Sequence, residues 1–181
     1  MRQAPRETAT TLTRLVELPG RGVTRVWECA GPRDAQTLML IHGLAATAEL
    51  NWKVFAPLSR HFRVVAADLR GHGDGMSAGS RFRLEDCADD VAALAETLEI
   101  GEFIAVGYSM GGMVAQLLYR QHATLLSGLV LCSTAGDVVG FTDREADRPG
   151  GAGDGRRHAV EPGRATYARP GPGTGTAGPH R

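Results

Sequence analysis

The chain has 181 residues, of which 43% are hydrophobic, and this length and composition predict a single domain with one core. Its formal net charge is zero, so no overall field favours nucleic acid or an anionic membrane as a partner. No stretch approaches the roughly 20 apolar residues that span a bilayer, and the three cysteines form no CxxC pair, so we expect a cytoplasmic protein.

Strand-like and helix-like apolar patterns alternate along the chain, which is typical of a parallel sheet covered by helices. In chain order, the patterns predict strands at residues 11–18, 23–29, 37–42, 62–67, 102–106 and 128–133, and helices at residues 51–61, 84–98 and 111–122. The turn signal Pro19-Gly20-Arg21-Gly22 predicts that the first two strands form an antiparallel hairpin. Pro57 is expected to shorten or kink the first helix.

The helix at residues 84–98 has the clearest amphipathic pattern, because its apolar residues recur at steps of three and four. Its carboxylates are expected on the outer side or in the first turns, where negative charge suits the helix dipole. They are Glu85, Asp86, Asp89 and Asp90.

The end of the chain differs sharply in composition from the rest. Residues 147–181 are rich in glycine, proline and arginine and contain no Leu, Ile, Phe, Met or Trp. Such a stretch buries too little apolar surface to offset the entropy of ordering it. We therefore expect a core at residues 1–146 and a disordered tail at residues 147–181.

The run Gly107-Tyr108-Ser109-Met110-Gly111 lies between a predicted strand and a predicted helix. A G-x-S-x-G sequence in this setting is typical of a nucleophile elbow, in which the glycines permit a sharp turn that presents the serine hydroxyl. The alternative is that Ser109 is only a turn residue that caps the following helix.

Two further motifs follow predicted strands. His42-Gly43-Leu44 ends the strand at 37–42, and Asp68-Leu69-Arg70-Gly71-His72-Gly73 follows the strand at 62–67. With the run from Gly107 to Gly112, they make the chain resemble the α/β-hydrolase superfamily over about residues 23–135, most closely its cofactor-free esterase, lactonase and perhydrolase members. The resemblance implies an α/β fold: a mostly parallel sheet flanked by helices.

The resemblance also implies roles for individual residues. Ser109 would attack the carbonyl carbon of a small-molecule ester, lactone or related acyl substrate, with neither a metal nor an organic cofactor. The backbone amides of Leu44 and Met110 would form the oxyanion hole. Tyr108 and Met113 would shape the acyl pocket, although an aromatic residue or a methionine at such positions more often serves simple packing. The motif residues expected to be structural are His42, Gly43, Asp68, Gly107, Gly111 and Gly112.

A serine nucleophile also needs a histidine base and an acid, in the chain order Ser, acid, His. Asp137 follows the last predicted strand and is the candidate acid, although it is equally well explained as a loop residue. His122 is better explained as a partner of the helix dipole at the end of its helix. His158 and His180 lie in the tail, where no predicted strand would position them.

The cap, the later strands and the histidine loop of the family are not recognisable after about residue 140. We therefore expect a fold that is incomplete after the sixth strand, in a chain that is truncated or frame-shifted at its C-terminal end. Two functions remain open: a serine hydrolase, or a catalytically silent fragment. The fragment would at most bind a ligand or self-associate through the exposed edge of its last strand.

Overall fold

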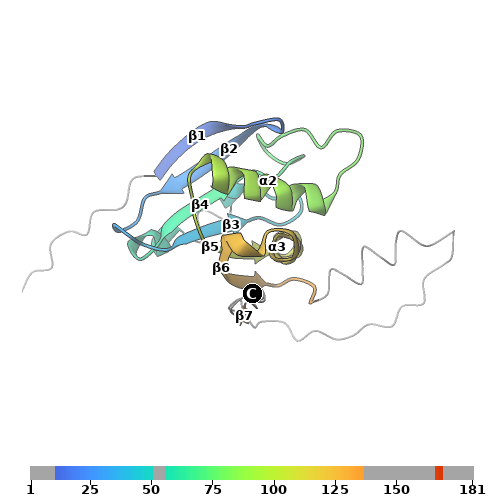
Figure 1. The fold of residues 1–181 in the computed structure, drawn as a ribbon. Helices are drawn as coiled ribbons and strands as arrows, with labels where there is room; N and C mark the ends of the chain where they lie inside the picture. The colour runs from blue at the N-terminus through green and yellow to red at the C-terminus, as the bar shows by residue number, and fades with distance from the viewer. Residues whose placement is uncertain (1–10, 51–55, 137–165, 169–181) are drawn as a thin grey trace, which may run out of the picture.

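The computed structural model describes residues 11–50, 56–136 and 166–168 (Figure 1). The strands are β1 Thr11–Leu18, β2 Gly22–Cys29, β3 Thr37–Ile41, β4 Arg63–Ala67, β5 Phe103–Tyr108, β6 Leu126–Cys132 and β7 Thr166–Ala168. The helices are η1 Ala56–Arg60, α2 Leu84–Thr97, α3 Met110–Gln121 and η2 Ala123–Leu125. None of the helices within these ranges is both long and apolar enough to cross a bilayer.

All the strands form one sheet in the order β1-β2-β4-β3-β5-β6-β7. The four neighbouring strands β4, β3, β5 and β6 run parallel to one another. Strand β3 lies between β4 and β5, with Leu38 opposite both Val64 and Ile104. Every residue of β3 is buried, as expected for a strand that is covered on both faces. The hairpin β1-β2 joins the sheet antiparallel to β4, which confirms the hairpin predicted from the turn residues.

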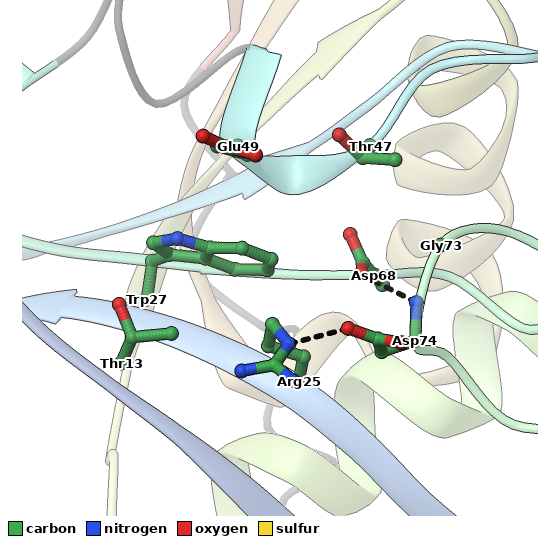
Figure 2. Close-up of a pocket in the computed structure, with 8 residues that line it drawn as sticks. All are labelled: Thr13, Arg25, Trp27, Thr47, Glu49, Asp68, Gly73 and Asp74. Atoms are coloured by element: carbon green, nitrogen blue, oxygen red, sulfur yellow. Dashed lines mark hydrogen bonds and ion pairs between the residues drawn. The ribbon is translucent and has the colours of Figure 1, made fainter.

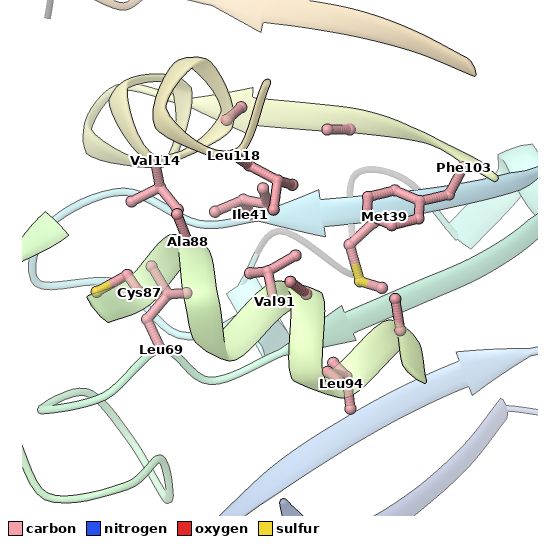
Figure 3. Close-up of a cluster of buried hydrophobic side chains, with 14 of the residues drawn as sticks. Met39, Ile41, Leu69, Cys87, Ala88, Val91, Leu94, Phe103, Val114 and Leu118 are labelled. Carbon is pink, nitrogen blue, oxygen red and sulfur yellow. The ribbon is translucent and has the colours of Figure 1, made fainter. Parts of the chain in front are cut away.

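The two faces of the sheet bury separate apolar clusters, because successive side chains of a strand point to opposite faces. Met39 and Ile41 pack with α2 and α3, where Val91 and Leu118 complete the cluster (Figure 3). Leu38 and Leu40 face the other side, in a cluster with Ala48 and with the partly buried Leu58 and Phe62. The layered α/β architecture is therefore the predicted one.

The predicted helices differ in how closely the structure follows them. α2 and α3 match the predictions to within a residue at each end. Of the helix expected at 51–61, residues 51–55 lie outside the described ranges, and the remainder is the short 3₁₀ helix η1 at Ala56–Arg60. Pro57 lies in this element, and proline has no N–H to donate to an α-helical hydrogen bond.

The prediction for Asp90 was wrong, because this carboxylate is buried rather than on the outer side of α2. One oxygen accepts from Nε of Arg21 and Nη2 of Arg70, and the other accepts from Nε of Arg70, all at 2.6 Å. A buried carboxylate is stable in such a place because two guanidinium groups satisfy its charge and its lone pairs. Asp90 thereby joins α2 to the β1-β2 turn and to the loop after β4.

The C-terminal region differs from the expectation at three residues. Thr166–Ala168 form β7, which pairs antiparallel with Leu129, Val130 and Leu131 of β6. The edge of β6 is therefore not open along its whole length, because β7 supplies partners for the backbone groups that an edge strand exposes. The remainder of the predicted tail lies outside the described residues.

Candidate active site

Ser109 lies between the end of β5 and the start of α3, at the carboxyl end of a central parallel strand. Its backbone has φ 51° and ψ −118°, a conformation that non-glycine residues rarely adopt. The residue is half-buried, so part of it is accessible to solvent. The strand, the sharp turn and the helix are the arrangement predicted from the G-x-S-x-G sequence.

The two glycines of this sequence are required by close packing. A Cβ atom at Gly107 would overlap the backbone of Gly111, and one at Gly111 would overlap the backbone carbonyl of Ile41 in β3. Neither residue has a positive φ, so the constraint is the space available rather than the backbone conformation. The glycines let α3 begin directly against the central strands, and this contact places Ser109 at the turn.

The turn over residues 43–46 lies against Ser109. The amide of Ala46 donates to the carbonyl of Gly43 at 3.3 Å, and a Cβ atom at Gly43 would come within 3.2 Å of the Ser109 Cβ. Leu44 is the second residue of this turn, so its amide takes no part in the turn's hydrogen bond. Met110 opens α3, and the first amides of a helix have no acceptor within the helix.

His42 is fully buried, and both of its ring nitrogens have backbone partners. Nδ1 is 2.8 Å from the Gly43 carbonyl, to which it donates, and Nε2 accepts from the amide of Leu69 at 2.9 Å. This pattern fixes a neutral imidazole with its proton on Nδ1. His42 therefore connects the turn at 43–46 to the loop after β4, which supports the expected structural role.

We expect the stability of the protein to fall as the pH drops below 6.5. Burial lowers the pKa of His42 below this ordinary value, against a smaller opposing effect of its hydrogen bond to Gly43. The unfolded chain therefore takes up this proton at a higher pH than the folded chain, and acid favours unfolding. Urea unfolding between pH 8 and pH 5 measures the effect.

His42→Gln is the matched variant for this measurement, because the side-chain amide of glutamine can donate and accept hydrogen bonds but does not titrate. Subtracting its pH profile from that of the wild type removes the contribution of the other histidines. Equal pH profiles for the two proteins would contradict the expectation.

Asp68 is also structural in this arrangement. Its two carboxylate oxygens accept from the amides of Ala48 at 2.8 Å and Asp74 at 2.9 Å, which ties the loop after β4 to the segment after β3. Figure 2 shows the second of these bonds beside a cavity of about 510 Å³, where Arg25 pairs with Asp74. Ser109 is not among the residues that line this cavity.

The two residues expected in the acyl pocket differ in their surroundings. Tyr108 is 46% exposed, and its ring lies over Gly43 beside the serine turn. Met113 is partly buried and packs against the apolar cluster beneath α3. Tyr108 therefore has an exposed ring beside the serine turn, whereas Met113 packs into the core beneath α3.

The structure explains His122 by a contact far from Ser109. His122 caps the C-terminal end of α3, and its Nε2 lies 2.8 Å from Oδ1 of Asp89 on α2. A helix of 12 residues is roughly 18 Å long, so His122 is too distant to act on the Ser109 hydroxyl. Another loop histidine, His72, has its Nδ1 3.0 Å from the Arg70 carbonyl.

No hydrogen bond joins the Ser109 hydroxyl to another residue of the described ranges, so no base is identified there. Asp137, His158 and His180, the remaining candidates for the acid and the base, lie outside those ranges. Within the same ranges, no three His, Cys, Asp or Glu side chains come together to hold a metal ion.

The sequence did not indicate two contacts that hold the Ser109 backbone. The amide of Ser109 donates to the carbonyl of Cys132 at 2.9 Å, and the hydroxyl of Thr134 donates to the carbonyl of Ser109 at 2.7 Å. The only trace in the sequence is Gly112, where a Cβ atom would overlap the Thr134 side chain. These contacts join segments about 25 residues apart, so local patterns could not reveal them.

Together, the parallel sheet and the strained serine between β5 and α3 define an α/β protein with a sharp strand-turn-helix at Ser109. A family model described as the alpha/beta hydrolase fold matches residues 36–152, which is more than half of the chain. The chain belongs to the α/β-hydrolase family.

Individual relatives agree with this family. A bifunctional esterase/perhydrolase of Acinetobacter calcoaceticus is 33% identical over 129 residues, 70% of this chain and 46% of the relative. A non-heme chloroperoxidase of Streptomyces lividans is 32% identical over 120 residues, 65% of this chain and 43% of the relative. The crystal structure of a hydrolase from Pseudomonas aeruginosa superposes with a TM-score of 0.60 and 27% identity, covering 74% of this chain and 51% of that one.

The chain spans less than half the length of the curated relatives it matches. These relatives support an enzyme of the α/β-hydrolase type.

Proposed function

We propose that the protein is a serine hydrolase that acts on a carboxylic ester, a lactone or a related acyl compound. The observation that carries the proposal is the strained backbone of Ser109, placed against the turn at residues 43–46. Backbone strain of this kind persists where the surrounding structure enforces it, and it is concentrated at functional sites. The esterase/perhydrolase among the relatives supports the same substrate class.

In this proposal, the Ser109 hydroxyl attacks the carbonyl carbon and forms a tetrahedral intermediate. The amides of Leu44 and Met110 stabilise the negative charge on its oxygen, aided by the partial positive charge at the start of α3. The intermediate collapses to an acyl-serine and releases the alcohol, and water then releases the acid. A histidine must take the proton from Ser109, and among the described residues no imidazole is bonded to that hydroxyl.

A second candidate function is a catalytically silent chain that at most binds an acyl ligand or another copy of itself. The observation that favours it is the lack of a base on Ser109 within the described ranges. Loss of a catalytic histidine can lower turnover about a million-fold while the nucleophile turn stays intact. The two functions therefore predict the same elbow but different serine reactivity.

We expect a fluorophosphonate probe to label the full chain at Ser109, because this reaction requires an activated serine. Ser109→Ala should lose the labelling completely. Ser77→Ala, which changes an exposed serine in the loop before α2, should retain it. Mass spectrometry of the labelled peptide measures the site, and circular dichroism confirms that each variant is folded. A folded wild-type chain that takes up no probe would support the silent chain instead.

A further inference from the structure

The strained conformation of Ser109 needs support from outside the turn, because the residue would otherwise relax to a more favourable backbone conformation. Gly107 and Gly111 only make room for the turn, and they hold nothing in place. Hydrogen bonds to the backbone of Ser109 supply such support directly. The end of β6 and the residues after it provide these bonds.

Both backbone polar groups of Ser109 are bonded to this segment. Its amide donates to the Cys132 carbonyl at 2.9 Å, and its carbonyl accepts from Oγ1 of Thr134 at 2.7 Å. The carbonyl also accepts from the amide of Gly112 at 2.9 Å, as part of α3. Thr134 is therefore the one side chain among the described residues that is hydrogen-bonded to Ser109.

The chain after β6 is shaped to bring Thr134 to this position. Ser133 has φ 47°, a left-handed conformation that redirects the chain as it leaves the strand. Nε2 of Gln116, on α3, donates to the carbonyl of Ala135 at 2.8 Å and so holds the far side of Thr134. Gly112 completes the fit, because a Cβ atom there would come within 2.6 Å of Oγ1 of Thr134.

We propose that Thr134 is a positioning residue for Ser109, and that its hydroxyl holds the serine backbone in the strained conformation. The inference rests on the proposed function of Ser109. Thr134 acts through the backbone carbonyl of Ser109 and does not touch the substrate. Gln116 assists by fixing the segment that carries Thr134.

Three variants of the full chain test this role. Thr134→Val removes the hydroxyl and nearly keeps the shape, and Thr134→Ser keeps the hydroxyl and removes the methyl group. Thr97→Val is the matched control, because Oγ1 of Thr97 donates to the carbonyl of Ala93, also at 2.7 Å, on the distant helix α2. For each variant, two quantities are measured: the rate of fluorophosphonate labelling at several probe concentrations, and the hydrogen exchange of the Ser109 and Gly112 amides.

We expect Thr134→Val to lower the maximal labelling rate about fivefold to tenfold, as the loss of one hydrogen bond implies. The probe concentration that gives half of this rate should not change, since Thr134 does not contact the probe. The two amides should exchange faster by a similar factor. Thr134→Ser should restore both quantities, and Thr97→Val should leave both unchanged.

Wild-type labelling and exchange in Thr134→Val would overturn the proposal. A loss in Thr134→Ser equal to that in Thr134→Val would also overturn it, because the methyl group would then be responsible. If the wild-type chain takes up no probe, the proposed function of Ser109 fails, and amide exchange alone decides the role of Thr134. If Thr134→Val does not fold, Gln116→Met should produce the same changes at about twofold, and no change there would count against the role.

Discussion

Gly111→Ala is expected to destabilise the protein by at least about 3 kcal/mol and to abolish labelling of Ser109. The new Cβ atom would overlap the carbonyl of Ile41 and come within 2.6 Å of the carbonyl of His42. These atoms cannot give way easily, because β3 is hydrogen-bonded to β4 on one side and to β5 on the other. The overlap would otherwise be relieved by a shift of α3, and this shift would move the serine turn away from residues 43–46.

Gly101→Ala is the matched control for this substitution. A Cβ atom at Gly101 meets nothing within 4 Å, and this glycine does not have a positive φ. We expect the control to leave the stability unchanged or to raise it by up to about 1 kcal/mol. Urea unfolding measures both variants. A Gly111→Ala protein as stable as the control would show that the start of α3 can move, against the packing described for the elbow.

Asp90→Ala is expected to destabilise the protein by about 3–5 kcal/mol, since it leaves two guanidinium groups without their main partner. Asp90 is only 3% exposed, and it bonds both Arg21 and Arg70 at 2.6 Å. Among the residues that the structure describes, Arg70 would retain only the ion pair with Asp86, whose carboxylate lies 3.6 Å from Nη1. The β1-β2 turn and the loop after β4 should therefore loosen together, and urea unfolding measures the loss.

Asp74→Ala serves as the control, because Asp74 also pairs with an arginine at 2.6 Å but its side chain is 62% exposed. Exposed ion pairs are screened by water, so we expect a loss of no more than about 1 kcal/mol. Losses of equal size in the two variants would show that the burial of Asp90 does not strengthen its ion pairs.

Apart from β7 and the short η2, the strands and helices along the chain and the position of the serine turn could be predicted from the sequence alone. Both depend on local features: apolar spacing identifies the elements, and a glycine on each side of Tyr108-Ser109-Met110 permits a tight turn between a strand and a helix. A structural role was also predicted for His42 through the family resemblance, and for Asp68 because its D-x-R-G-x-G run after a strand is typical of a hydrogen-bonded turn. Their hydrogen-bond partners, Leu69 and Ala48, became known from the structure.

Other features were decided by the tertiary structure, because they depend on contacts between segments far apart in the chain. Asp90 had the local setting of a solvent-exposed carboxylate, and it is buried because Arg21 and Arg70 reach it from two other elements. Thr134 had no local signal, and it meets Ser109 only because β5 and β6 end side by side. Spacing along a chain determines which face of an element a residue occupies, whereas the folding of the sheet determines which distant group meets it there.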